Sequence, residues 1–181
     1  MLKLCDNPPA RFPAELDLAD TQGRWRIAHT RSRNEKALAR ALLVWGVPYY
    51  LPLYKRRWVR RGRRFETVMP LFPGYVFFSG DDDVRTTVLT TNRVAQVIEV
   101  TDQEQFIEEL TQIETAVERD ATFDPYPGLV RGRRCRVLTG ALAGLEGIIE
   151  SRRRGCRLVL QVTTLGQAVC VEIDADAVEP V

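Results

Sequence analysis

The order of hydrophobic and polar positions predicts strands and helices in turn along the first 118 residues. Residues 25–30 alternate large apolar and polar side chains, which is the pattern of a half-buried strand. After Asn34, which is expected to cap a helix, the apolar residues of 36–45 recur about one helical turn apart, and Gly46 ends the pattern. Further strands are expected at 47–53, 75–78 and 94–100, and further helices at 84–89 and 101–118.

The segment at 55–67 has a different pattern, because basic and aromatic residues are mixed in it. Two β-prone arms flank Arg61-Gly62, which predicts a protruding hairpin with few apolar side chains to bury. Pro-Leu-Phe-Pro-Gly follows at 70–74, and its prolines donate no backbone hydrogen bond, so a rigid turn is expected there rather than a central strand. This turn leads into the aromatic strand at 75–78, which is either buried on both faces or exposes an aromatic face.

The pattern changes after the breaker cluster Asp-Pro-Tyr-Pro-Gly at 124–128. Four short strands separated by turn residues then predict a small all-β barrel without helices. The predicted fold class is therefore α+β, with an antiparallel sheet packed against helices followed by an all-β barrel. The expected domain limits are a flexible N-terminal tail at 1–23, a first domain at 24–118, a linker at 119–128 and the barrel at 129–181.

Composition narrows the function classes. The chain has 181 residues, of which 45% are hydrophobic and 28% charged, and it has no long apolar window, so a globular protein outside the membrane is expected. Its four cysteines form no CxxC pair, which favours a reducing cytoplasm. With one histidine, no phosphate-binding glycine loop and no carboxylate pair in an apolar setting, we expect no enzyme activity, no cofactor and no metal site.

The net charge of +2 hides a strong asymmetry along the chain. Residues 24–64 hold 13 Lys or Arg and one acid, whereas residues 81–125 hold 12 acids and three arginines. The excess of arginine over lysine in the first segment favours phosphate binding, although a solvated charge run or mutual neutralisation of the two segments also fits. The nucleic-acid-binding candidates are Arg31, Arg33, Lys55, Arg56, Arg57, Arg60, Arg61, Arg63 and Arg64.

Two separate segments carry motifs of one protein family. Trp25, the helix before Gly46, Tyr-Leu-Pro at 50–52, the basic hairpin and Pro-Leu-Phe-Pro-Gly-Tyr-Val-Phe at 70–77 resemble the amino-terminal domain of NusG/RfaH-type transcription elongation factors. The segment at 140–173, with three glycines followed by a Leu-Gly turn and a strand, resembles a KOW module. Their order and spacing match as well, and the resemblance covers residues 24–181.

The resemblance implies a bacterial factor that binds the clamp helices of the RNA polymerase large subunit and lies near the DNA of the transcription bubble. Carried over by position, the polymerase-binding candidates are His29, Tyr75, Phe77 and Val100, with Arg85, Thr86 and Thr87 for the opposite jaw. A plain core role is the alternative for the aromatic residues, and capping of a helix N-terminus is the alternative for Thr86. The expected partners of the KOW module are ribosomal protein S10 or Rho, although Ala141-Leu142 replaces the Pro-Phe that is usual there.

The predicted function is a monomeric transcription elongation or antitermination factor. The N-terminal extension, His29, the Ala141-Leu142 departure and the basic hairpin favour a specialised NusG paralogue rather than a housekeeping member. The alternative is a ribosome- or RNA-associated binding protein that acts through its KOW domain, because residues 126–181 alone would allow it. The C-terminal strands are rich in β-branched residues, so the barrel is expected to be stable and not to convert to helices.

Overall fold

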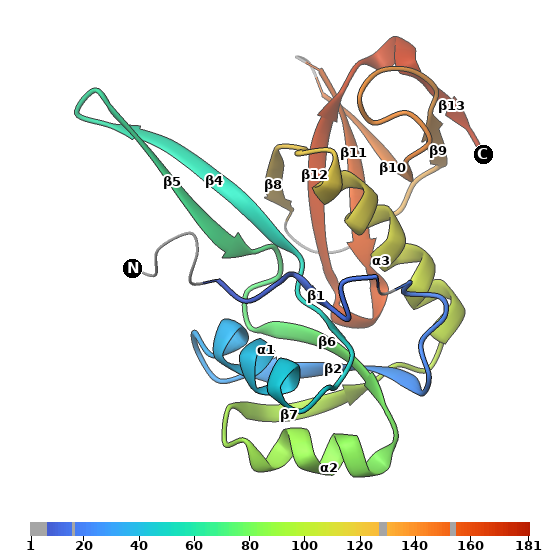
Figure 1. The fold of residues 1–181 in the computed structure, drawn as a ribbon. Coiled ribbons are helices and arrows are strands. Elements are labelled where there is room, and N and C mark those ends of the chain that lie inside the picture. The colour runs from blue at the N-terminus through green and yellow to red at the C-terminus, as the bar shows by residue number, and fades with distance from the viewer. Residues whose placement is uncertain (1–6, 16, 127–129, 153–154) are drawn as a thin grey trace. The chain divides into compact units, whose positions relative to one another are not determined.

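The computed structural model describes residues 7–15, 17–126, 130–152 and 155–181. Its internal contacts divide the chain into two units, Met1–Gln103 and Glu104–Val181. Each unit has its own sheet, and both sheets are antiparallel (Figure 1). This arrangement confirms the predicted α+β fold class. None of the helices among these residues is long and apolar enough to cross a bilayer.

The first unit is built on a five-stranded sheet with the strand order β1-β3-β6-β2-β7. Its strands are β1 (Arg11–Phe12), β2 (Arg24–Thr30), β3 (Tyr49–Tyr50), β6 (Tyr75–Gly80) and β7 (Val94–Glu99). Helices α1 (Glu35–Val44) and α2 (Asp82–Thr90) join them. Leu38 and Leu42 of α1 and Val88 of α2 pack in one cluster with Val76 and Phe78 of β6, so both helices cover the same face of the sheet.

The helix ends differ in how they are capped. Asp81 caps α2, since its Oδ1 accepts a hydrogen bond of 2.9 Å from the backbone N–H of Val84. Asn34 stands at the N-cap position of α1, but its side chain makes no capping bond and instead donates to the Ser32 carbonyl at 3.0 Å. The prediction that Asn34 caps the helix with its side chain is therefore wrong.

The N-terminal residues 7–15 and 17–23 pack onto the first unit, which corrects the prediction of a flexible tail. Strand β1 extends the sheet beyond β3, and the Phe12 ring stacks on Tyr49 with centroids 6.5 Å apart. Leu18 is buried, and its carbonyl accepts a 2.9 Å hydrogen bond from the indole N–H of Trp25. The few apolar anchors of this segment show no period in the sequence, because distant residues rather than neighbours bury them.

Strands β4 (Leu53–Arg60) and β5 (Arg63–Pro70) form the predicted hairpin. Its turn has positive φ at both central residues, 50° at Arg61 and 72° at Gly62, which is the geometry of a two-residue turn that suits twisted strands. Among the residues that the structure describes, the two strands pair only with each other, and the hairpin extends away from the five-stranded sheet of its unit (Figure 1).

The second unit contains helix α3 (Gln103–Glu118) and a six-stranded sheet with the order β13-β9-β10-β11-β12-β8. Its strands are β8 (Phe123–Tyr126), β9 (Arg134–Val137), β10 (Glu146–Arg152), β11 (Gly155–Val162), β12 (Gln167–Ile173) and β13 (Val178–Pro180). All four expected strands are present, and β8 and β13 were not expected. This all-β region is consistent with a KOW module.

Two features of the second unit depart from the expected domain limits. Strand β8 pairs with β12 and lies inside the segment predicted as a linker at 119–128, because backbone pairing with a distant strand can override a local Pro signal. Helix α3 binds the C-terminal sheet, since Gln112 accepts a 2.9 Å hydrogen bond from the N–H of Glu146 and Glu109 accepts one of 2.9 Å from the N–H of Thr163. The functional limits 24–118 and 129–181 remain predictions.

Candidate functional site

The turn that precedes β6 is fixed by contacts on both sides. Gly74 has φ +88°, a conformation that L side chains rarely adopt. Its N–H donates a 2.7 Å hydrogen bond to Oε1 of Glu35 at the start of α1, and its carbonyl accepts one of 2.7 Å from the N–H of Thr30 in β2. Glu35 is itself buried. Helix α1 and strand β2 therefore determine together where the chain enters β6.

The first residue of β6 forms a partly exposed ring pair with β2. Tyr75 lies opposite His29 in the register, and the two rings stack with centroids 4.9 Å apart and planes 19° apart. Both side chains are half-buried, and the imidazole also borders Gly74. An aromatic pair with polar atoms and open surface can bind another protein through apolar contact and hydrogen bonds. The sequence singled out both residues but could not show that they touch.

Phe77 and Val100 do not share this exposure. Phe77 is 0% exposed, and its ring lies 6.4 Å from Tyr50 and 6.1 Å from Phe72, measured between centroids. Val100 is 1% exposed, and its carbonyl accepts a 2.9 Å hydrogen bond from the amide of Gln103. Neither side chain reaches the surface, so the candidate contact surface narrows to His29 and Tyr75. Strand β6 is buried on both faces from Val76 onward, which is one of the two alternatives for this strand, and only its first residue, Tyr75, stays partly exposed.

Arg85, Thr86 and Thr87 lie on α2, on the opposite face of the sheet from His29 and Tyr75. This follows because α2 covers the face formed by Val76, whereas neighbouring residues in a strand point to the other face. Thr86 and Thr87 are exposed, and their hydroxyls donate 2.9 Å hydrogen bonds to the carbonyls four residues earlier. Thr86 therefore does not cap the helix.

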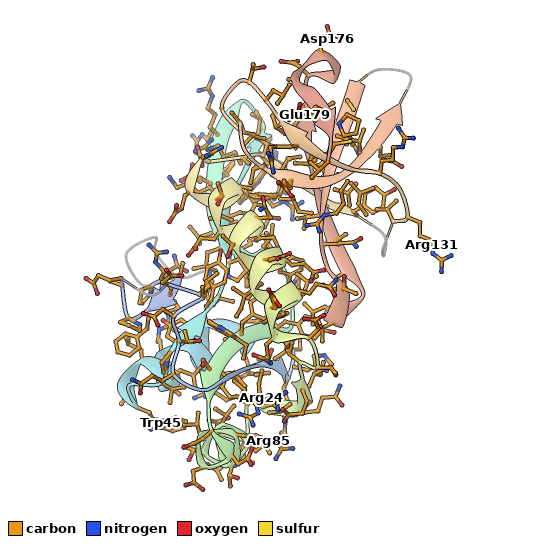
Figure 2. The ribbon with its side chains drawn as sticks, turned by 90° about the vertical axis from the view of Figure 1, so that its right-hand side faces the viewer. Arg24, Trp45, Arg85, Arg131, Asp176 and Glu179 are labelled. Carbon is orange, nitrogen blue, oxygen red and sulfur yellow. The ribbon has the colours of Figure 1, made fainter. Side chains whose placement is uncertain are left out.

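Arg85 is partly exposed and forms a 3.0 Å ion pair with Glu99 of β7. Figure 2 shows the Arg85 side chain on α2 at the periphery of its unit. The structure therefore keeps the two groups of polymerase-binding candidates on separate surfaces. Any partner that contacts both groups must reach two faces of one sheet.

The hairpin presents its basic residues to solvent. All seven candidates are exposed: Lys55, Arg56, Arg57, Arg60, Arg61, Arg63 and Arg64. Arg57 forms a 2.8 Å ion pair with Glu66 across the hairpin. The rings of Trp58 and Phe65 stack with centroids 5.7 Å apart and planes 16° apart. The combination of cations and exposed aromatic rings is typical of nucleic-acid-binding surfaces.

The start of α1 is linked to strand β5 of the hairpin, and two basic candidates lie in the loop before it. Arg31 and Arg33 are exposed in this loop. Lys36, in the first turn of α1, donates a 2.6 Å hydrogen bond from Nζ to the carbonyl of Val68 in β5. Partial burial lowers the pKa of Lys36 from its usual value, with a further contribution from the nearby Arg40. Lys36 therefore ties the first turn of α1 to strand β5 of the hairpin.

One residue that shapes the site was missed by the sequence analysis. Glu35 is not among the sequence-based candidates, but its carboxylate accepts a hydrogen bond from the N–H of Gly74, which lies 39 residues further along the chain. No local signal marks such a contact. Among the described residues no group of His, Cys, Asp or Glu could hold a metal ion.

These observations define a mixed α+β binding protein that carries an exposed basic hairpin and an aromatic pair on one unit. A protein-family model described as "NusG: Transcription termination factor nusG" matches residues 23–115, about half of the chain. The chain therefore belongs to the NusG family and is a NusG-type transcription elongation factor. Members of this family are non-enzymatic factors.

Two further comparisons add little. No curated protein matches this chain. A solved structure, titled "Crystal Structure of MjSpt4:Spt5 complex conformation B", is 14% identical, with 87% of this chain and 96% of that chain covered and a TM-score of 0.30. A similarity at that TM-score carries no argument here, so the assignment depends on the NusG family model.

Proposed function

We propose that this NusG-family factor binds RNA polymerase through its first unit and promotes processive elongation, acting as an antitermination factor. The observation that carries the proposal is the stacked His29–Tyr75 pair, which is partly exposed at the end of a turn fixed by Glu35. Aromatic side chains in rigid, partly exposed positions are typical of protein-binding hot spots. The family resemblance suggests the clamp helices of the polymerase large subunit as the surface that this pair contacts.

The polymerase contact proposed for His29 and Tyr75 needs a rigid surface, and the local structure supports one. Gly74 is held from two sides, so Tyr75 enters β6 in a defined direction. A preorganised side chain loses little conformational entropy on binding. Arg85, Thr86 and Thr87 form a second proposed contact on α2, directed to the opposite side of the polymerase cleft.

The basic hairpin is the proposed nucleic-acid contact. Its exposed arginines, together with the exposed Arg31 and Arg33 in the loop before α1, would neutralise phosphates of DNA near the transcription bubble. Affinity of this kind depends on salt and not on sequence. The hairpin joins directly to the turn before Tyr75, so one continuous segment would contact both polymerase and DNA.

The remaining parts of the proposal concern the second unit and the cellular setting. A KOW-type domain at 129–181 would bind a second partner, for which ribosomal protein S10 or Rho are the candidates. The factor would act as a cytoplasmic monomer without catalytic activity. Free, buried thiols such as Cys135 and Cys156 are typical of a reducing compartment. The N-terminal strand β1 and the basic hairpin favour a specialised paralogue.

The test is polymerase binding and elongation with the full chain. The double variant His29→Ala, Tyr75→Ala should lose polymerase binding and the elongation effect while remaining folded. Trp45→Ala is the matched control, because Trp45 is an aromatic residue of the same unit that is 45% exposed outside the proposed surface (Figure 2). Unchanged polymerase affinity in a folded double variant would refute the proposed contact. Retention of ribosomes instead of polymerase would favour the KOW-based alternative.

A further inference from the structure

Strand β2 contains a buried arginine, Arg26, that is not among the binding candidates. It is 5% exposed, and in the register it lies opposite Phe78 of β6 and Glu99 of β7. Phe78 belongs to the cluster under helices α1 and α2, so Arg26 points to the helix-covered face of the sheet. Arginine is almost never buried unless its charge is paired, so its partners indicate what it holds in place.

All three nitrogens of the Arg26 guanidinium group have acceptors. Nε donates to both carboxylate oxygens of Glu99, at 3.2 and 3.0 Å. Nη1 donates to the carbonyls of Gly80 at 2.6 Å and Asp81 at 3.1 Å, and Nη2 donates to Oδ1 of Asp82 at 2.7 Å. One side chain therefore joins the end of β6, the start of α2 and strand β7, and it is not itself a contact for a partner.

Glu99 links this buried group to the surface. Its side chain is 52% exposed, and Oε1, which accepts from Arg26, also accepts a 3.0 Å hydrogen bond from Nε of Arg85 on α2. The carboxylate thus lies between a buried guanidinium group and a partly exposed one. Arg26 fixes the carboxylate of Glu99, and this carboxylate in turn holds Nε of Arg85.

The backbone of α2 is also held in place near Arg85. A Cβ added to Gly80 would lie 2.6 Å from the Val84 side chain, so α2 packs closely on the end of β6. Arg26 binds the first turn of the helix through Asp82. Arg85 follows Val84 directly, so both its backbone and its Nε are ordered, and an ordered side chain loses little conformational entropy on binding.

The terminal nitrogens of Arg85 remain open to a partner. Among the described residues only Nε of this side chain has an acceptor, and the side chain is 39% exposed at the periphery of its unit (Figure 2). The hydroxyls of Thr86 and Thr87, by contrast, donate to carbonyls within the helix. A planar guanidinium group anchored at Nε can present Nη1 and Nη2 as two donors in a fixed direction.

The surrounding charge indicates which acceptor suits these donors. Residues 81–83 are three exposed aspartates, and together with Glu99 they contribute four carboxylates against the two guanidinium groups of Arg26 and Arg85. This excess of negative charge disfavours the approach of a phosphate backbone or of a further carboxylate. A carbonyl oxygen accepts hydrogen bonds without adding charge, so it is the acceptor that fits.

We propose that Arg85 donates from its terminal nitrogens to carbonyl oxygens of a protein loop on RNA polymerase, and that Glu99 and the buried Arg26 are the positioning residues of this contact. This inference rests on the proposed function, because it names the acceptor and the support of the second contact on α2. The three arginine and glutamate side chains act as one unit, in which only Arg85 touches the partner.

The first experiment measures the affinity of the full chain for core RNA polymerase with and without a nucleic-acid scaffold. Arg85→Gln should weaken binding about tenfold in both cases, the size expected when hydrogen bonds from a charged donor are lost. Arg131→Gln is the matched control, because it removes the same charge from an exposed arginine of the second unit and should leave affinity unchanged. An effect of Arg85→Gln that appears only with the scaffold would assign Arg85 to a phosphate and overturn the inference.

The second experiment tests whether Glu99 acts through Arg85. Glu99→Gln keeps the size of the side chain but removes its charge, so it should weaken polymerase binding in the wild-type background and have no further effect in the Arg85→Gln background. Glu104→Gln is the control, since Glu104 is an exposed acid on α3, and it should leave affinity unchanged. Equal losses from Glu99→Gln in both backgrounds would refute its role as a positioning residue.

The third experiment applies the same comparison to Arg26. Arg26→Lys keeps the charge, but an ammonium group cannot reach acceptors on three elements as the planar guanidinium does. Binding should weaken in the wild-type background only, whereas a merely structural role would weaken it equally in the Arg85→Gln background. Urea unfolding shows whether the variant is folded, and if it is not, the Glu99→Gln comparison decides the question.

The inference and the proposed function can fail separately. Unchanged affinity of folded Arg85→Gln, together with lost binding in the His29→Ala, Tyr75→Ala variant, would refute only the inference. Absence of polymerase binding by the wild-type chain would refute the proposed function.

Discussion

Tyr75 and Phe77 are neighbours on one strand face, yet the structure predicts opposite consequences when each is replaced by alanine. Phe77 is fully buried between Tyr50 and Phe72, so Phe77→Ala should destabilise the first unit by about 3–5 kcal/mol, the range for a buried phenylalanine. Such a loss is a large fraction of the about 5–15 kcal/mol that holds a typical domain together. For a unit of this size it corresponds to a fall in Tm of about 12 °C or more.

Tyr75→Ala should cost far less stability. Its ring is half-buried and stacks on His29, and a stacked aromatic pair contributes about 0.5–1.5 kcal/mol. Polymerase affinity should instead fall strongly, because the proposed contact loses its largest ring. A double substitution of Tyr75 and Phe77 would mix the two effects and could not identify the contact surface.

The assay is urea unfolding of the full chain and of both single variants, followed by circular dichroism and intrinsic fluorescence, alongside polymerase binding at a temperature where both variants are folded. The unfolding midpoint should drop clearly for Phe77→Ala and only slightly for Tyr75→Ala at unchanged slope. A stability loss below about 1 kcal/mol for Phe77→Ala would show that Phe77 does not fill a core position. The assignment of the contact surface to His29 and Tyr75 would then be refuted.

Three other predictions follow from single contacts. Burial raises the pKa of Tyr49 to about 12. The stability that the buried neutral hydroxyl contributes is therefore fully present below pH 10 and is lost as the pH rises to about 12. Across this range the urea unfolding midpoint should fall more for the wild type than for Tyr49→Phe. Glu35→Ala leaves the N–H of Gly74 without its carboxylate acceptor, so it should lower the free energy of unfolding by about 1–3 kcal/mol and also weaken polymerase binding. Glu35→Gln should have a smaller effect on both the unfolding free energy and polymerase binding. Phe12→Ala should destabilise the first unit by about 1–2 kcal/mol in urea unfolding, and an unchanged midpoint would show that β1 does not hold the sheet edge.

Features that depend on near neighbours were predictable from the sequence. The hairpin turn needed two residues that tolerate positive φ, and Arg61-Gly62 flanked by β-prone arms indicated it. The acidic residues 81–83 have the charge that suits a helix N-terminus, and α2 begins there with Asp81 as its cap. Asn34 shows the limit of such signals, because its side chain found Ser32 and Arg93 as partners instead of the helix N-terminus.

The sequence alone also determined the fold class, the exposure of the basic hairpin and the family resemblance, because periodicity, turn residues and charge runs are properties of short segments. The tertiary structure decided which candidates reach the surface. It buried Phe77 and Val100, stacked His29 on Tyr75, joined Glu35 to Gly74 and brought residues 7–15 and 17–23 onto the first unit. Each of these outcomes depends on partners far away in the chain, and burial is set by the elements that pack together rather than by the pattern of any one segment.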